Sequence, residues 1–303
     1  MIYTVTLNPS IDYHVWLPSM QEGTIHQVQK EWKVAGGKGI NVSKVLRNLG
    51  CRSIALGFIG GFTGAFIRQQ LEQEGIEHRL IPVAQDSRIN VKIKAERETD
   101  LSGVSPLISA EAQSQLMEQL DQLGSGDFLV LAGSVPESMP PNIYQIIMNQ
   151  MNRQQVRVIL DAKGAALGNS LAEKPFLIKP NHHELGELFG VNVQTAEEAV
   201  RCGKRALEMG AVNVIVSMAG KGAVFVNREQ AFVAEFPRQQ AINSIGAGDS
   251  MVAGFLYAFT RGLDVRESFR FAVASGCTTA ISEGFCTPAA IEAFLPLITI
   301  HEA

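Results

Sequence analysis

The stretch AGGKGINVSKVLRNLG, residues 35–50, joins a run of glycines to the start of an amphipathic helix. Glycines directly before a helix let backbone amides approach an anion, and the N-terminus of the helix adds its dipole. Lys38 adds a positive charge at this point, and Asn41 is placed to reach a hydroxyl group of a ligand. The same residues also fit a tight turn between a strand and a helix, so the run alone leaves both interpretations open. The Walker A pattern GxxxxGK[ST] does not occur in the sequence.

A second glycine-rich stretch, NSIGAGDSMVAGF at residues 243–255, has the same form. The small residues that lead into an apolar helix, predicted over 250–260, are Gly246, Ala247 and Gly248. Their bare amides suit the oxygens of a phosphoryl group in transfer, and the carboxylate of Asp249 suits a base that accepts a hydroxyl proton. The structural alternative is an aspartate that caps the helix after a glycine turn.

Apolar runs of strand length alternate with amphipathic runs of helix length around these two stretches. The predicted strands are 2–7, 53–58, 128–132, 156–160, 176–178 and 212–216, and the predicted helices are 39–49, 63–74, 109–122, 140–153 and 195–209. Strands that are apolar throughout are typical of a parallel sheet covered on both faces. The sequence therefore predicts one α/β domain over 1–303, with a doubly wound, mostly parallel sheet flanked by helices.

Two segments, 13–34 and 88–101, have the periodicity of strands without a following helix, and they predict a small antiparallel sheet apart from the main body. In the second segment Arg88, Asn90 and Lys92 share one face, and isoleucine and valine residues occupy the other. We expect these segments to form a lid over about 12–34 and 88–102. Because its strand at 13–17 is apolar on both sides, we also expect a homodimer through the lid.

Composition excludes several classes of partner. Charged residues make up 18% of the 303 residues, and the formal net charge is −4, which argues against nucleic-acid or membrane-surface binding. No apolar run is long enough to span a bilayer, and residues 1–12 lack the features of a signal peptide. We therefore expect a cytoplasmic protein. The four cysteines form no CxxC pair, and we expect free thiols.

Together, the two glycine-rich stretches resemble the two signature motifs of the ribokinase-like, or PfkB, carbohydrate kinases. The first is similar in G36-G37-K38-G39-I40-N41-V42-S43 with Gly50 and Gly60, and the second over residues 243–255. Similar short segments are NPSID at 8–12, AGSVP at 132–136, KPNHHE at 179–184 and SMAGKGA at 217–223, where Ala219 replaces the first glycine of the family pattern. The resemblance extends over essentially the whole chain and implies the ribokinase-like fold.

The resemblance also implies phosphoryl transfer from ATP to a sugar, with Mg²⁺ as cofactor, and leaves open a monovalent cation. Asp249 would be the base, and the amides at Gly246, Ala247 and Gly248 would form the anion hole. Residues implied for the sugar phosphate are Asp12, Gly37, Lys38, Asn41, Arg88, Asn90, Lys92 and Ser134. Residues implied for ATP are Lys179, Asn181, Ser217, Gly220 and Gly222, with Glu184 near Mg²⁺ through water.

The acceptor is expected to be a sugar phosphate, because a dianion needs cations and Lys38, Arg88 and Lys92 supply them. GGKGINV together with SRINVKI is similar to the branch of the family that phosphorylates the 6-hydroxyl of fructose 1-phosphate. Tagatose 6-phosphate is the alternative acceptor. A more distant alternative is a regulator that binds a sugar phosphate without catalysis, because a fold does not fix a function.

Overall fold

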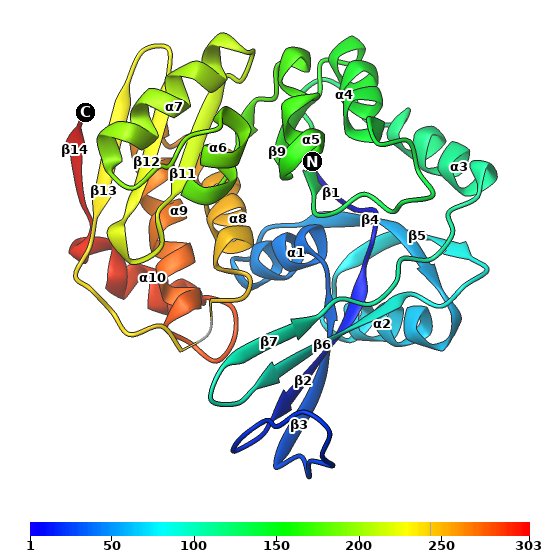
Figure 1. The fold of residues 1–303 in the computed structure, drawn as a ribbon. Helices are drawn as coiled ribbons and strands as arrows, with labels where there is room; N and C mark the ends of the chain where they lie inside the picture. The colour runs from blue at the N-terminus through cyan, green and yellow to red at the C-terminus, as the bar shows by residue number, and fades with distance from the viewer. Residues whose placement is uncertain (243) are drawn as a thin grey trace.

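The computed structural model describes residues 1–242 and 244–303, so Asn243, the first residue of the second glycine-rich stretch, lies outside the described residues. Over the described ranges the strands form two separate sheets, one of ten strands and one of four (Figure 1). The larger sheet, in spatial order, consists of β14 (Thr299–Glu302), β13 (Ala231–Glu235), β12 (Ala223–Asn227), β11 (Asn213–Ser217), β10 (Leu177–Ile178), β9 (Arg157–Asp161), β8 (Phe128–Ala132), β1 (Ile2–Thr6), β4 (Ser53–Gly60) and β5 (Glu77–Val83).

The strands from β11 to β5 pair in parallel, and β12, β13 and β14 extend the sheet as an antiparallel edge. This confirms the predicted doubly wound, mostly parallel α/β fold. The six predicted strands are β1, β4, β8, β9, β10 and β11, each displaced by at most two residues at either end. The sequence interpretation did not include β5 or the antiparallel edge.

Helices cover both faces of the large sheet (Figure 1). One face packs against α1 (Lys38–Asn48), α2 (Gly61–Gln73), α8 (Ala247–Phe259), α9 (Val265–Ala280) and α10 (Pro288–Phe294). The other packs against α3 (Ala110–Leu120), α4 (Ile143–Arg153), α5 (Gly164–Gly168), α6 (His182–Phe189) and α7 (Ala196–Glu208). None of the helices in residues 1–242 and 244–303 has the length and apolar character needed to cross a membrane.

The small sheet consists of β3 (Lys30–Gly36), β2 (Ser10–Trp16), β6 (Arg88–Lys94) and β7 (Glu98–Leu101), in that order. The prediction of an antiparallel sheet is wrong at its centre, because β2 and β6 pair in parallel, whereas β2–β3 and β6–β7 are antiparallel. The chain passes through β3, α1, β4, α2 and β5 between β2 and β6, and such a long crossover allows a parallel pair. The sheet projects away from the helical layers (Figure 1).

Register places the polar residues of β2 and β6 on one face of the small sheet. Ser10 lies opposite Arg88 and Asp12 lies opposite Asn90, so these four side chains point to the same side. That side faces the carboxyl ends of the parallel strands in the large sheet, where ligands of open α/β sheets bind.

Candidate active site

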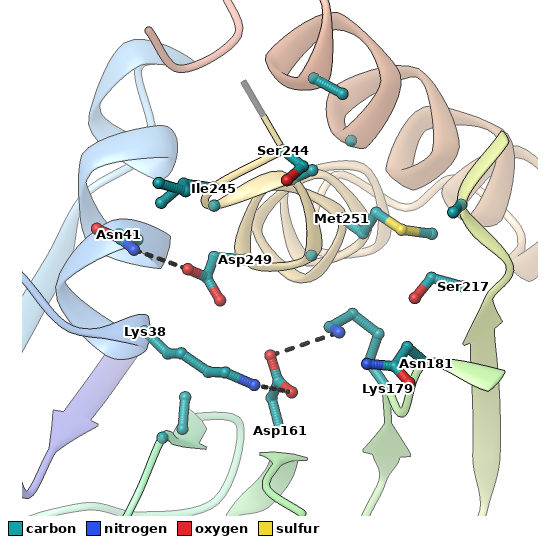
Figure 2. A pocket seen from close by; sticks show the side chains of 18 of the residues that line it. Lys38, Asn41, Asp161, Lys179, Asn181, Ser217, Ser244, Ile245, Asp249 and Met251 are labelled. Atoms are coloured by element: carbon teal, nitrogen blue, oxygen red, sulfur yellow. Dashed lines mark hydrogen bonds and ion pairs between the residues drawn. The ribbon is translucent and has the colours of Figure 1, made fainter. Parts of the chain in front are cut away.

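A cavity of about 880 Å³ lies between the small sheet and the carboxyl ends of β1, β8, β9 and β10. Its size is typical of a site for small-molecule ligands. All the site residues predicted from the sequence line this cavity, although they come from both glycine-rich stretches, from both sheets and from the first turns of α1, α6 and α8. Figure 2 shows how the central side chains converge from α1, from α8, from the end of β9 and from the residues directly after β10.

Asp249 is the third residue of α8, and its carboxylate points into the centre of the cavity (Figure 2). Its side chain is buried, and Oδ2 accepts a hydrogen bond of 2.8 Å from Nδ2 of Asn41 on α1. The helix begins after Gly246, which has a φ of 77°. A Cβ atom on Gly246 would lie 2.4 Å from the ring of Phe285, so the turn before α8 needs glycine for its conformation and for its space.

Burial is the main reason that the pKa of Asp249 is raised to about 6, and the negative charge of Asp161 raises it further. Lys38, Asn41 and Lys179 oppose this shift, because each of them stabilises the carboxylate. A carboxyl group with a pKa near neutrality is ionised at the pH of the cell and can still accept a proton in a reaction, which is the property of a general base.

Lys38, Asp161 and Lys179 form a charged group opposite Asp249, in which Asp161 and Lys179 are buried and Lys38 is partly exposed to the cavity (Figure 2). Nζ of Lys38 donates a hydrogen bond of 2.9 Å to Oδ1 of Asp161, and Nζ of Lys179 lies 3.6 Å from Oδ2 of the same carboxylate. Desolvation disfavours the charge on Lys38, but Asp161, Asp249 and Glu184 outweigh it and raise the pKa of Lys38. Lys38 therefore stays positively charged inside the cavity.

Asp161 is the residue of this group that the sequence interpretation missed. It is the last residue of β9, 1% exposed, and both lysines hold the pKa of its carboxyl below the usual value although burial acts in the opposite direction. Its Oδ2 has no hydrogen-bond partner among the described residues. The signal in the sequence is an aspartate at the carboxyl end of a predicted parallel strand, the position at which α/β sheets place ligand-binding groups.

The sugar-phosphate residues implied by the resemblance gather where the small sheet meets the cavity. Oδ1 of Asp12 accepts hydrogen bonds from Oγ of Ser10 at 2.8 Å and from Nδ2 of Asn90 at 2.9 Å. A Cβ atom on Gly36 would lie 2.4 Å from this carboxylate, so glycine is needed for the close contact between β3 and Asp12. Arg88 donates from Nε to the backbone oxygen of Asn8 at 3.3 Å.

Lys92 lies on the same face of the small sheet, two residues beyond Asn90 on β6. Its Nζ donates a hydrogen bond of 2.9 Å to Asp100 on the neighbouring strand β7. Burial lowers the pKa of Arg88, while Asp12 opposes the shift, so the guanidinium is partly desolvated and is directed at the cavity. Ser134, after β8, accepts a hydrogen bond of 3.2 Å from Nδ2 of Asn8.

The far end of the cavity is formed by the residues implied for the nucleotide. Ser217 ends β11, and the tight turn after it places Ala219, Gly220 and Gly222 along the wall. Ala219 has a φ of 51°, so this turn keeps the left-handed conformation that glycine adopts more readily. The helix α9 contributes Val273, Gly276, Cys277 and Ala280 to the wall at this end of the cavity.

Asn181 and Glu184 form a capping box at the start of α6. Oδ1 of Asn181 accepts from the backbone N–H of Glu184 at 2.8 Å, and Oε2 of Glu184 accepts from the backbone N–H of Asn181 at 2.9 Å. The second carboxylate oxygen of Glu184 is not used by the cap. Across the described ranges no cluster of three His, Cys, Asp or Glu side chains could hold a metal ion by itself.

The chain is similar to known proteins over nearly its whole length. A model of the family described as pfkB family carbohydrate kinase matches residues 5–291. The 1-phosphofructokinase of Bacillus subtilis is 46% identical over 99% of this chain and 99% of its own length. The D-tagatose-1-phosphate kinase of Bacillus licheniformis is 35% identical over 94% of each chain.

A similar solved structure is phosphofructokinase-2 from Escherichia coli in complex with fructose-6-phosphate. It has a TM-score of 0.90 and 27% identity, and the match covers 97% of this chain and 98% of that chain. Other structures of the same relative are a complex with potassium and a tetrameric inhibited form.

Proposed function

This chain belongs to the pfkB family of carbohydrate kinases, and we propose on that basis that it is a 1-phosphofructokinase. It transfers the γ-phosphoryl group of ATP to the 6-hydroxyl of fructose 1-phosphate and releases fructose 1,6-bisphosphate and ADP. The observation that carries this assignment is the 46% identity to the enzyme of Bacillus subtilis over 99% of both chains. The position of Asp249, in one cavity with Lys38 and Arg88, supports it.

Asp249 acts as the general base in the proposed mechanism. The 6-hydroxyl oxygen attacks the γ-phosphorus, the bond from that phosphorus to the β,γ-bridging oxygen breaks, and the hydroxyl proton passes to Asp249. Asn41 holds Oδ2 of the carboxylate and so fixes its orientation. The amides at 246–249 and the dipole of α8 stabilise the charge on the phosphoryl oxygens.

Lys38 and Lys179 act on the group that is transferred. The sequence interpretation placed Lys38 with the 1-phosphate. Its hydrogen bond to Asp161 and its electrostatic interaction with Asp249 favour a role at the transferred phosphoryl group instead. Asp161 lies between the two ammonium groups and directs both of them toward the place where negative charge develops. Asp161 is a positioning residue in this scheme.

The acceptor lies against the small sheet. Asp12, Gly37, Asn41 and Ser134 hold the sugar hydroxyls, and Arg88, Asn90 and Lys92 hold the 1-phosphate. Arg88 is suited to this role because a partly desolvated guanidinium binds a dianion strongly.

ATP occupies the other end of the cavity, against Lys179, Asn181, Ser217, Gly220 and Gly222. The residues present fit Mg²⁺ only as an ion held chiefly by phosphate and water, because Glu184 offers one uncommitted carboxylate oxygen and no cluster of acidic groups surrounds it. When bound, Mg²⁺ neutralises charge on the phosphates. We keep a monovalent cation as part of the proposal, since a relative was crystallised with potassium.

The exposed side chains of the small sheet support the proposed homodimer through the lid. Trp16 is 41% exposed, Trp32 is 39% exposed and Leu101 is 53% exposed. Exposed apolar side chains of this size are typical of a protein–protein contact, and burying them against a second copy of the chain is more favourable than leaving them in water. A cytoplasmic location belongs to the same proposal.

The test is a comparison of acceptors with the purified protein. ADP release should give the highest kcat/KM with fructose 1-phosphate, and ³¹P NMR should identify fructose 1,6-bisphosphate as the product. Arg88→Met should raise the KM for fructose 1-phosphate about tenfold or more and leave the KM for ATP nearly unchanged, since it removes a charged hydrogen bond to the acceptor alone. Tight binding of fructose 1-phosphate without ADP release would instead indicate a regulator.

D-Tagatose 1-phosphate is a second candidate acceptor, because a relative with 35% identity is named for it. It differs from fructose 1-phosphate in the configuration at C4 and presents the same 1-phosphate and 6-hydroxyl. Tagatose 6-phosphate, the alternative from the sequence, has its phosphate on the oxygen that must attack if transfer occurs at the 6-position. Equal or higher kcat/KM with either tagatose phosphate would overturn the assignment to fructose 1-phosphate.

A further inference from the structure

Lys44, on α1, is a buried lysine that the transfer mechanism does not use. It is 7% exposed, and its Nζ donates a hydrogen bond of 3.0 Å to the backbone oxygen of Ala35. The same Nζ lies 3.3 Å from Oε1 of Glu74, directly after α2. Burying an ammonium group is costly unless it is paired and hydrogen-bonded, so this arrangement needs a reason.

The contacts of Ala35 show what Lys44 holds. Ala35 lies in β3, an edge strand of the small sheet, so some of its backbone groups have no neighbouring strand to pair with. Its oxygen accepts from Lys44, and its N–H donates to Oε1 of Gln70 on α2. Both polar backbone groups of one residue are therefore held by side chains of helices that belong to the main body.

The bond from Lys44 to Ala35 also closes the first glycine-rich stretch into a ring. Gly36, Gly37, Lys38 and Asn41 all lie between the two bonded residues, and the last three line the cavity. Gly37 has a φ of 123°, which few other residues adopt, so this backbone is easily displaced unless something fixes it. The backbone of Gly36 lies so near the carboxylate of Asp12 that a Cβ atom there would be 2.4 Å from it, so displacement of β3 changes the surroundings of that carboxylate as well.

We propose that Lys44 is a positioning residue for the acceptor site, which fixes the small sheet to α1 and α2 through the backbone oxygen of Ala35. The hydrogen bond to Ala35 performs this role, and the ion pair with Glu74 keeps the ammonium group in place. Nζ of Lys44 has no part in proton or phosphoryl transfer. This role rests on the proposed function, because the acceptor it names is the sugar phosphate.

Lys44→Met keeps the length of the side chain and removes the donor. We expect the KM for fructose 1-phosphate to rise about tenfold or more, with kcat and the KM for ATP changed less than about threefold, because a displacement near 1 Å is enough to lose productive orientation. Glu74→Gln removes the charge of the partner but keeps an amide oxygen that can accept from Nζ. The bond from Lys44 to Ala35 therefore stays in place, and the acceptor KM should change less than threefold. Hydrogen exchange of residues 33–38 should be about tenfold faster in Lys44→Met only, because the strand end has lost a fixed contact.

Val45→Ala is the matched control, because Val45 is the next residue of α1, is 0% exposed and packs in the core cluster with α8 and α9. It destabilises the same helix without touching Ala35. An equal rise in acceptor KM in Val45→Ala would overturn the positioning role, and so would an unchanged acceptor KM in Lys44→Met. If Lys44→Met does not fold, Gln70→Met removes the other contact to Ala35 and should give the same split between the acceptor and ATP.

The two proposals can fail separately. Hydrogen exchange needs no substrate. If the wild type is inactive on fructose 1-phosphate but exchange at 33–38 is still faster in Lys44→Met than in the wild type, the contact is supported and fructose 1-phosphate is rejected as acceptor. Full activity of the wild type, together with unchanged exchange in Lys44→Met, would reject the role of Lys44 and leave the proposed function intact.

Discussion

Asp249→Asn should remove turnover and, at neutral pH, make the folded protein more stable. Asparagine fills the same space and can accept the hydrogen bond from Asn41 through its amide oxygen, but it cannot accept the proton of the 6-hydroxyl. Loss of a general base costs about 10²- to 10⁴-fold in kcat. The gain in stability follows because a carboxylate that is buried for catalysis is held in an unfavourable environment.

The size of this gain follows from the pKa of Asp249, which is about 6 in the folded protein and 3.8 ordinarily. The difference, 6 minus 3.8, corresponds to about 3 kcal/mol at about 1.4 kcal/mol for each pH unit. The folded state binds this proton more tightly than the unfolded state, so the wild type loses stability as pH rises from about 4 to 6. Above pH 6 the full difference is present, and near pH 4 less than about 1 kcal/mol of it remains.

Urea unfolding of both proteins, followed by circular dichroism at pH 7.5 and at pH 4, measures the effect. Asp249→Asn should be more stable than the wild type by about 2–3 kcal/mol at pH 7.5, with most of the gain lost at pH 4. Asp264→Asn is the control, because Asp264 caps α9 through its side chain and asparagine caps as well as aspartate. A gain that is absent at pH 7.5, or equal at both pH values, would refute a pKa near 6 for Asp249.

Two further predictions concern the same turn and the same base. The kcat/KM for the acceptor should fall as the pH is lowered, with a midpoint near pH 6. Asp161→Asn should move this midpoint to lower pH, because the charge of Asp161 helps to raise the pKa of Asp249. If the midpoint instead reflects titration of the substrate phosphate, it will not move in this variant. Gly246→Ala should lower kcat by about 100-fold or more, because a methyl group would clash with Phe285 and displace the anion hole. Gly262→Ala, at a φ of 86° with nothing within 4 Å, carries the same backbone strain and should keep full turnover.

The large sheet and the two helix starts were predictable because their signals are local. An apolar run of five residues predicts a buried strand without knowledge of its neighbours, and a glycine before an amphipathic run marks a turn that few other residues allow. Gly37 lies directly before α1 and Gly246 directly before α8, and both have positive φ values. Periodicity cannot show which strands pair, and the parallel pair of β2 and β6 was therefore missed.

The charged group in the cavity was only partly predictable. Lys38 and Lys179 belong to recognised motifs, but Asp161, whose carboxylate lies between them, ends a strand that carries no such motif. Asp161 meets Lys38 across 123 positions of sequence, because β9 lies near the middle of a sheet whose order differs from that of the chain. Lys44 lies inside the first glycine-rich stretch, but its proposed role depends on a hydrogen bond to the backbone of Ala35. A pattern of side chains in the sequence cannot predict such a bond.

Asp161 links two demands that the cavity must meet together. A chain with a net charge of −4 binds two phosphate compounds, so positive charge must be concentrated in the cavity. Two lysines that point into one cavity repel each other unless an anion lies between them. Asp161 is that anion, and the same charge raises the pKa of Asp249. An uncharged residue at 161 would therefore weaken the alignment of both lysines and, at the same time, make Asp249 a weaker base. The aspartate at the end of β9 is the residue that keeps cation and base compatible in one site.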